Sequence, residues 1–363
     1  MTPKVSIIIP CYNVARYVRE CVESVVAQTL REIEIIIIND GSTDSTGEIL
    51  REFASKDKRV ILIEQENGGY GVAVNKGIAR AKGEFVGIVE SDDFINPTMY
   101  EKLYDKAKQT GAEVVKCNFF VYDSKSVEKN HTYNPKFQDL NLAPNGAFNP
   151  RKDFQQIFFF HASVWANLYE SNFIKDIRFF ESTKVYQDLP FAMEILAKTK
   201  TMAIIKEPLY HYRMEINQGN STQFITPERL MQMAQMTDEA LKVLLRYCVL
   251  EQIKEYFFAH AMSPNYSFYY KTSPKIWKEF CTKMREILSH YTEPQWTYFE
   301  PKIKKWAQMI MQGKVPKQSF KQYRRKLFRL RVRDGGIYLK LGNFEWKRAF
   351  RQNQRQIKSK EQQ

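Results

Sequence analysis

Short apolar runs alternate with helical patterns over the first hundred residues, and this alternation limits the possible folds more than any other feature. Four runs rich in branched aliphatic residues are separated by segments whose apolar residues recur at helical spacing. These runs are Val5–Ile9, Ile33–Ile38, Val60–Ile63 and Phe85–Val89. Strands that are apolar on both faces are typical of a parallel sheet covered by helices on each side. The sequence therefore predicts a doubly wound α/β domain, which binds ligands at the carboxyl ends of its strands.

The same alternation continues beyond this core and then changes. From Pro227 onward the pattern is helical and aromatic, without strand alternation. We predict a mostly parallel α/β domain over residues 1–225, followed by a mainly α-helical region over residues 226–363. The further elements predicted between residues 99 and 213 are a helix at Met99–Thr110 and strands at Glu113–Val121, Met202–Ile205 and Leu209–Arg213.

Composition excludes several classes of protein. With 44% hydrophobic and 26% charged residues among 363, the chain has the composition of a globular protein, not of a disordered or collagen-like one. Five scattered cysteines with no C-x-x-C spacing argue against a zinc site and against a disulfide framework. No segment approaches 18 consecutive apolar residues, and the first residues are typical of a strand, not of a signal peptide. We therefore expect a cytoplasmic protein.

The basic charge is concentrated at the end of the chain. Residues 301–363 contain 19 lysines and arginines against 3 acidic residues, whereas the whole chain has a net charge of +14. Between Trp306 and Trp346 the basic residues are interspersed with aromatic and aliphatic ones, which favours an interfacial helix on the inner face of an anionic plasma membrane. The alternatives are the solvated face of an ordinary helical domain or a disordered tail after Lys347. Nucleic acid is not an expected partner, because no nucleic-acid-binding motif accompanies the charge.

Four polar clusters follow the predicted strands, where a doubly wound sheet places its site. They are Pro10–Asn13, Asn39–Asp44, Asn67–Asn75 and Glu90–Asp93. Three carboxylates within the last cluster repel one another, and Mg²⁺ or Mn²⁺ would relieve that repulsion while bridging to phosphate oxygens. The alternative is a solvated acidic turn that caps the next helix.

The other clusters suit a nucleotide but also have structural explanations. Asp40 can accept a hydrogen bond from a base, and Asn67 can donate to a phosphate beside its glycine-rich turn. The segment from Asn39 to Asp44 is equally good turn chemistry with a helix cap. The glycine spacing does not match the dinucleotide-binding pattern.

In order and spacing these motifs resemble the N-terminal half of family-2 glycosyltransferases, which have the GT-A fold. The motifs are V-S-I-I-I-P-C-Y-N, I-I-N-D-G-S-T-D, N-G-G-Y-G-x-x-x-N-K-G and G-E-F-V-G-I-V-E-S-D-D, across about residues 4–100. Weaker similarity follows in W-A-N-L-Y (165–169), Y-Q-D-L-P-F (186–191) and Y-H-Y-R (210–213). The resemblance therefore covers roughly residues 1–225.

The resemblance implies a role for each matching position. The base, usually uracil, would contact Pro10, Tyr12 and Asp40, and Asn67 would lie near the ribose or the diphosphate. Glu90, Ser91 and Asp92 occupy the family's D-x-D motif, with Asp92 as the first and Asp93 as the second candidate metal ligand. Asp188 occupies the place of the base that deprotonates the acceptor hydroxyl; from the residues alone, a helix N-terminal position is the alternative.

The motif Tyr210–Arg213 is expected to be a strand that closes the site. Strand alternation places His211 and Arg213 on one face, where both can meet a diphosphate, and Tyr210 and Tyr212 on the other. The alternative is an edge strand with a solvated face. Trp165 is expected to pack in the core and not to serve as a sugar platform.

The sequence departs from the family pattern at four positions. These are Glu90 in place of the first Asp of D-x-D, Gln187 in place of a usual Glu, Val74 in place of a common Arg, and Asn167 in place of a frequent Lys. The departures bear on the identity of the donor more than on the class of activity.

The residues and the resemblance together predict a metal-dependent, inverting glycosyltransferase. Its donor would be a nucleotide-sugar, a UDP-sugar first, with Mn²⁺ or Mg²⁺ as cofactor. Its acceptor would be a bacterial surface glycan or lipid-linked intermediate, such as lipopolysaccharide, capsule or a teichoic-type polymer. Two alternatives stay open: a nucleotidyltransferase on a related sheet, and a non-catalytic protein that binds nucleotides or nucleic acid.

Overall fold

We describe the protein from a computed structural model. Its described residues are 2–123, 131–132, 146–152, 163–183, 186–214 and 226–317, together with the backbone of three strands between residues 328 and 349. The chain divides into two compact units, Met1–Gly313 and Lys314–Gln363. The first unit contains the sheet and the helical region that follows it.

The first half of the sheet is parallel, as the alternation of apolar runs predicts. Its strand order is β3-β2-β1-β4, and each neighbouring pair is parallel. The side chains of β1 and β2 are buried throughout, which explains why their sequences are apolar without interruption. The strands are β1 (Val5–Cys11), β2 (Ile33–Asp40), β3 (Val60–Gln65) and β4 (Phe85–Ile88), and the helices between them are α1 (Val18–Val26), α2 (Thr46–Lys56) and α3 (Tyr70–Arg80).

Beyond β4 the sheet is mixed. The order continues β4-β9-β6-β10-β5, with β9 antiparallel to both neighbours, β10 parallel to β6, and β5 antiparallel to β10. The two strands predicted at residues 202–213 are one strand, β10, whose register shifts around Pro208 because proline lacks the N–H that a ladder needs. The strands are β5 (Phe94–Ile95), β6 (Val114–Tyr122), β9 (Asn167–Glu170) and β10 (Met202–Arg213), with β7 (His131–Thr132) and β8 (Ala147–Phe148) paired at β6 and β10.

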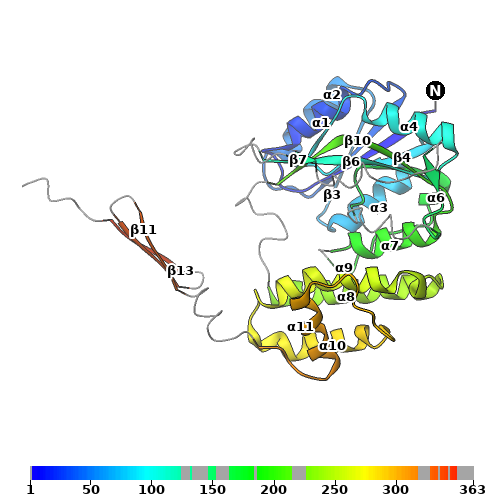
Figure 1. The fold of residues 1–363 in the computed structure, drawn as a ribbon. Coiled ribbons are helices and arrows are strands. Elements are labelled where there is room, and N and C mark those ends of the chain that lie inside the picture. Colours follow the sequence, from blue (N-terminus) through cyan, green and yellow to red (C-terminus); the bar gives the residue numbers. More distant parts are fainter. Residues whose placement is uncertain are drawn as a thin grey trace, which may run out of the picture. The chain divides into compact units, whose positions relative to one another are not determined.

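Helices cover both faces of this sheet. Figure 1 shows α1, α2 and α4 (Met99–Thr110) over one face, and α3 and α7 (Asp188–Lys198) over the other. Alternate residues of β2 accordingly enter different clusters: Ile35 and Ile37 join the large core, while Ile36 and Ile38 pack with Ala73 of α3. The polar residues at the strand ends are thus left at the carboxyl edge of the sheet.

The helical region packs against α7. Figure 1 shows α8 (Pro227–Arg246) and α9 (Leu250–Tyr269) side by side beneath α7, with α10 (Trp277–Leu288) and α11 (Pro301–Met311) beyond them; a single 3₁₀ turn, η3, spans Pro274–Ile276. Helix α8 begins at a Thr226 cap, whose side chain accepts the N–H of Arg229, followed by Pro227 in the first turn. The hydroxyl of Tyr247 donates to Glu194 of α7 at 3.1 Å, which links the two helices at the far end of α8.

The second unit corrects the prediction of helix, and of an interfacial helix, for residues 328–349 of the basic segment, whereas Pro301–Met311 at the start of that segment is helical as predicted. Residues between 328 and 349 form a three-stranded antiparallel sheet of β11 (Phe328–Arg333), β12 (Gly336–Leu341) and β13 (Phe344–Ala349). The sequence F-R-L-R-V-R alternates with a period of two, which is the period of a strand. Residues 318–327 and 350–363 lie outside the described part of the chain, and with them all but the first two residues of the tail considered as an alternative after Lys347.

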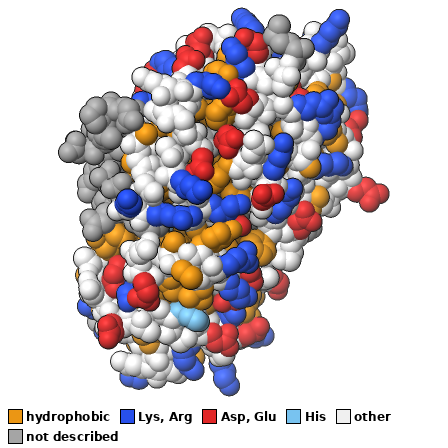
Figure 2. Space-filling model, turned by 90° about the vertical axis from the view of Figure 1, so that its right-hand side faces the viewer, with side chains coloured by type: hydrophobic (Ala, Val, Ile, Leu, Met, Phe, Trp, Pro, Cys, Tyr) orange, Lys and Arg blue, Asp and Glu red, His pale blue; other side chains and the backbone are white. Residues whose placement is uncertain are grey.

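The surface carries charges of both signs. On the face shown in Figure 2, basic and acidic side chains are interspersed, and hydrophobic side chains gather over part of the helical region. Among the described residues, no helix has the length and apolar character needed to cross a bilayer.

Candidate active site

A cavity of about 560 Å³ lies at the carboxyl edge of the parallel strands. Its walls come from the ends of β1, β2 and β4, from the turn before α3 and from the first turn of α8. Its size is that of an ordinary small-molecule site. The lining residues include five of the predicted site residues, Pro10, Tyr12, Asp40, Asn67 and Glu90, together with Cys11, Val14, Gly69, Tyr70, Ala73, Ser91, Thr226, Glu228, Arg229 and Gln232.

The loop after β1 is held by side chains of the loop after β2. Asn13 has a positive φ of 51°, and its side-chain oxygen accepts the N–H of Thr43 at 2.8 Å. In return the N–H of Asn13 donates to Ser42 at 3.1 Å, and that of Val14 donates to Thr46 at 2.9 Å. These bonds hold the loop so that Tyr12, 49% exposed, stands at the rim of the cavity.

Asp40 acts as a clamp on the glycine-rich turn. Its Oδ1 accepts from Gln65 Nε2 and from the N–H of Gly68, both at 2.8 Å, and its Oδ2 accepts the N–H of Gly69 at 2.8 Å. Gly69 has a φ of 92°, a conformation that residues with a side chain rarely adopt. Asp40 therefore fixes the backbone that presents Asn67 to the cavity.

The acidic turn after β4 begins with a carboxyl group in an apolar setting. Glu90 accepts a hydrogen bond from the hydroxyl of Tyr70 at 2.6 Å. Burial raises the pKa of Glu90 to about 8, and the negative charges of Asp92 and Asp188 act in the same direction. The charge of Asp188, a residue far away in the sequence, thus also acts on the Glu90 carboxyl group.

Asp93 is buried and hydrogen-bonded within the turn. Its Oδ2 accepts from the hydroxyl of Tyr210 at 2.7 Å, and its Oδ1 accepts from the backbone N–H of Arg213 at 2.7 Å. Burial, with repulsion from Asp92, raises the pKa of Asp93 well above its ordinary value. Both oxygens of this residue, the second metal candidate, thus tie β10 to the acidic turn.

Asp92 lies between these two engaged carboxyl groups. Burial raises its pKa, and the positive charge of Arg213 opposes that shift. Among the described residues, no three His, Cys, Asp or Glu side chains are grouped so that they could hold a metal by themselves. Mg²⁺ commonly binds through one or two carboxylates together with substrate phosphates, so a single aspartate fits that cation.

Asp188 is the first residue of α7, and a well-fixed loop precedes it. Its Oδ1 accepts the N–H of Leu189 at 3.0 Å, and burial raises its pKa above the ordinary value. The neighbouring Gln187 donates from Nε2 to the carbonyl oxygens of Phe180 and Thr183. A glutamate, the usual residue at position 187, would bring a carboxylate toward two carbonyl oxygens. The amide at Gln187 is therefore matched to this loop.

Asn75 holds the same loop from α3. Its Nδ2 donates to the carbonyl oxygen of Phe179 and to Glu181 Oε1, both at 2.9 Å, and its Oδ1 accepts the N–H of Phe179 at 2.9 Å. The last residue of the glycine-rich motif thus positions the chain that leads to Asp188.

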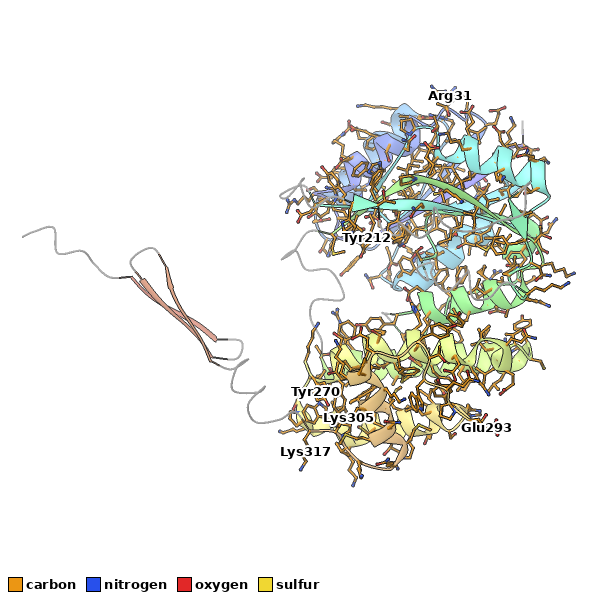
Figure 3. All side chains as sticks on the ribbon, in the orientation of Figure 1. Arg31, Tyr212, Tyr270, Glu293, Lys305 and Lys317 are labelled. Atoms are coloured by element: carbon orange, nitrogen blue, oxygen red, sulfur yellow. The ribbon has the colours of Figure 1, made fainter. Side chains whose placement is uncertain are left out.

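The alternation predicted for the end of β10 is confirmed. His211 stacks on Phe94 with ring centroids 4.4 Å apart, and the Arg213 guanidinium lies over the same ring. Tyr210 and Tyr212 instead stack on Trp165, which is 6% exposed and so packs in the core, as predicted. Figure 3 labels Tyr212 on the side of the sheet that faces the helical region.

His211 and Arg213 are not among the residues that line the cavity. Burial lowers the pKa of His211. The Nε of Arg213 donates to the carbonyl oxygen of Asp92 at 2.8 Å, and its terminal nitrogen pairs with Glu20 of α1 at 2.5 Å. The Arg213 side chain is buried beneath the acidic turn, where it fixes the backbone of Asp92. Its guanidinium also lies over the rings of Tyr17, Phe94 and Tyr122.

Several lining residues had no counterpart in the sequence prediction. Tyr70 belongs to a motif already noted, but its bond to Glu90 depends on the packing of α3. Four more lie beyond the similarity to the family: Thr226, which caps α8, and Glu228, Arg229 and Gln232 of α8 itself. The T-P-E start of α8 is a visible helix signal, yet nothing local indicates that this helix returns to the edge of the sheet.

Comparisons with known proteins agree with this geometry. A family model described as "Glycosyl transferase family 2" matches residues 6–172. EpsJ of Bacillus subtilis, described as an uncharacterized glycosyltransferase, is 34% identical over 224 residues, which are 60% of this chain and 63% of EpsJ. GgaB of the same species, described as a minor teichoic acid biosynthesis protein, is 26% identical over 304 residues, 78% of this chain and 32% of GgaB. The chain thus spans less than two thirds of the length of these relatives.

Solved structures share the fold. The crystal structure of S. aureus TarS 1–349 in complex with UDP-GlcNAc has a TM-score of 0.69 at 20% identity and covers 95% of this chain and 98% of that chain. The TarS complex with UDP has a TM-score of 0.67 at 19% identity and the same coverage. The likeness confirms the predicted GT-A-like sheet covered by helices and followed by a helical region.

Proposed function

We propose that the protein transfers a sugar from a UDP-sugar, with a divalent cation, to a hydroxyl of a surface glycan or lipid-linked acceptor; the match of residues 6–172 to the model of glycosyl transferase family 2 supports this class of activity. The observation that carries the proposal is the cavity itself. It brings the ends of three strands together around Tyr12, Asp40, Asn67 and Glu90. TarS, which shares the fold, is known in complexes with UDP and UDP-GlcNAc, and this supports uridine as the nucleoside.

The residues at the acidic turn suit a divalent cation. We assign Asp92 as the metal ligand, because both oxygens of Asp93 already accept hydrogen bonds within the protein. When bound, Mn²⁺ or Mg²⁺ would neutralise charge on the diphosphate leaving group. Arg213 contributes by fixing the Asp92 carbonyl oxygen, and hence the position of the carboxylate. Glu90, at the first position of the motif, faces the cavity beside the hydroxyl of Tyr70.

We assign the role of catalytic base to Asp188, which implies inversion at the sugar carbon. A base must accept the proton of the acceptor hydroxyl as that oxygen attacks, and a raised pKa makes a carboxylate better suited to this step. Burial raises the pKa of Asp188, as this role requires. Gln187 and Asn75 hold the loop before Asp188 through its carbonyl oxygens and N–H groups, which limits the movement of the base.

The acceptor is proposed at the level of class. GgaB and EpsJ support a bacterial surface glycan, of which a teichoic-type polymer, capsule and lipopolysaccharide are examples. The basic segment of residues 301–363 suits an anionic acceptor or the anionic inner face of the plasma membrane. In this proposal the charge of residues 328–349 acts from a sheet, and not from an interfacial helix.

The test is calorimetric titration of the whole chain with UDP, with and without Mn²⁺, with GDP and CDP as controls. We expect UDP to bind more tightly in the presence of Mn²⁺, and Asp92→Ala to lose that metal-dependent increment while it keeps its fold. Binding of UDP that does not respond to Mn²⁺ would remove the metal from the proposal. If no nucleotide bound under either condition, the proposed activity would be wrong.

A further inference from the structure

We propose that Arg229, in the first turn of α8, is the protein's own cation for the diphosphate of the nucleotide donor. The inference rests on the proposed function, and it adds a donor-binding residue that lies beyond the matched family domain, in the helical region. The donor site would then consist of residues from two parts of the chain: the α/β domain, which ends with β10, and the helical region, which begins with α8.

The position of Arg229 is the first observation. It lines the same cavity as Asp40, Asn67 and Glu90, and it is half-buried there. Its charge acts on Tyr186, two residues before Asp188: burial raises the pKa of Tyr186 to about 12, and Arg229 opposes that shift. Arg229 therefore stands in the wall of the proposed nucleotide cavity, and its charge also reaches the segment that leads to the proposed base.

The charge of the cavity is the second observation. Among the described residues that line it, Asp40, Glu90 and Glu228 carry carboxyl groups and Arg229 is the single cation. An anionic diphosphate entering such a cavity needs opposite charge close by, and a divalent ion at Asp92 would supply only part of it. A guanidinium presents paired N–H donors that match phosphate oxygens.

The two other positions from which a cation was expected do not supply one to the cavity, which is the third observation. Arg213 is bound to Glu20 and to the carbonyl oxygen of Asp92. Position 74, where the family commonly has an arginine, is Val74, a residue with no exposed surface in this chain. Arg229 thus supplies from α8 a positive charge that α3 does not provide.

The rigidity of α8 allows Arg229 to act from a fixed position. The Thr226 side chain accepts the N–H of Arg229 at 3.2 Å, which sets the first residue of the helix. Further along, Met236 and Thr237 are buried, Thr183 donates to the Met236 sulfur at 3.4 Å, and Asn265 of α9 donates to Thr237 at 3.0 Å. The helix is therefore anchored both to the loop that leads to Asp188 and to its neighbour α9.

The experiment compares Arg229→Gln, Arg229→Lys and wild type in calorimetric titrations of the whole chain with UDP and with uridine, in the presence of Mn²⁺. Arg246→Gln is the matched control, because it removes the same charge from an exposed position in the last turn of the same helix. Losing a charged hydrogen bond to a phosphate should weaken UDP binding by roughly tenfold or more. Uridine, which lacks phosphate, should bind Arg229→Gln and wild type alike, and Arg229→Lys should keep part of the UDP affinity.

Each outcome has one meaning. If Arg229→Gln and Arg246→Gln bind UDP as tightly as wild type, Arg229 does not contact the diphosphate and the inference is overturned. If Arg229→Gln weakens uridine as much as UDP, the arginine supports the shape of the cavity and not the phosphates, which also overturns the inference. If the wild type itself binds no nucleotide, the proposed function fails, and the inference fails with it.

Discussion

The hydroxyl of Tyr210 donates to Asp93 Oδ2 at 2.7 Å and accepts the backbone N–H of Glu90 at 3.1 Å. A single phenol therefore joins β10 to both ends of the acidic turn. Tyr210→Phe would leave the buried Asp93 carboxylate with one partner fewer and the N–H of Glu90 with none from β10. We expect the free energy of unfolding to fall by about 1–3 kcal/mol, measured by urea denaturation.

Tyr212→Phe is the matched control for this prediction. Tyr212 lies on the same strand and stacks on the same Trp165 ring, but within the described part of the chain its hydroxyl makes no hydrogen bond to the acidic turn. Tyr212→Phe should therefore lower the free energy of unfolding by less than Tyr210→Phe does. Equal losses in the two variants would mean that the turn does not depend on the Tyr210 hydroxyl.

Asp188→Asn should separate binding from transfer. Asparagine keeps the size of the side chain but cannot take up the acceptor proton, so we expect turnover to fall by roughly 10²- to 10⁴-fold while UDP binding stays unchanged. In the wild type, turnover should rise with pH through a pKa above the ordinary aspartate value, because burial raises the pKa of Asp188 and only its ionised form is a base. Wild-type turnover in the variant would show that another group takes the proton.

Much of this site could be predicted from the sequence because its parts are local motifs at the ends of apolar strands. Pro10, Tyr12, Asp40, Asn67 and Glu90 meet in one cavity, as the geometry of a parallel sheet requires. The partners of Asp93 and Arg213 could not be predicted in the same way. Their hydrogen bonds cross from β4 to β10 and to α1, and no spacing along the chain encodes such contacts.

Two other differences have physical causes of their own. The place of Arg229 at the cavity could not be predicted, because it depends on how α8 packs against the rest of the protein, and that packing is set by tertiary contacts. The strands at residues 328–349 were not predicted, because the basic and aromatic composition of this segment favours an interfacial helix. The structural signal is instead the period-two alternation of Phe328–Arg333.

The role of the Gln187 amide can be tested by substituting glutamate, the residue that is usual in the family at this position. Its Nε2 donates to the carbonyl oxygens of Phe180 and Thr183, and the side chain is 3% exposed. Gln187→Glu replaces a donor with a buried carboxylate that faces two oxygens, so we expect the free energy of unfolding to fall by about 1–3 kcal/mol at pH 8.

The pH dependence gives this prediction its sign. Burial among acceptors would raise the folded-state pKa of the introduced carboxyl above its unfolded value. The loss should therefore be larger at pH 8 than at pH 5, where the carboxyl is protonated and can donate one bond. Gln187→Met, which removes the donor without adding charge, should be destabilised equally at both pH values. A Gln187→Glu protein as stable as wild type at pH 8 would mean that the loop can rearrange.

Lys116 has a buried amine in the core of the sheet, and its effect on stability can be tested through the pH dependence of unfolding. Its Nζ donates to Ser163 Oγ at 2.9 Å and to Asn167 Oδ1 at 3.3 Å, and burial lowers its pKa from 10.5 to about 8. Lys116 thus brings a lysine nitrogen from β6 to Asn167, the position where the family frequently has a lysine.

The sign of the effect follows from the lowered pKa. Between pH 8 and 10.5 the unfolded chain holds a proton that the folded chain has released, so the contribution of Lys116 to stability increases with pH across that interval. Lys116→Met removes this dependence, while the other lysines titrate alike in both proteins. Relative to the variant, the wild type should therefore gain about 3 kcal/mol in free energy of unfolding on going from pH 7.5 toward 10.5, measured by urea denaturation. If the two proteins changed in parallel, Lys116 would be charged in the folded core at neutral pH without penalty, and its two polar partners would be enough to stabilise it.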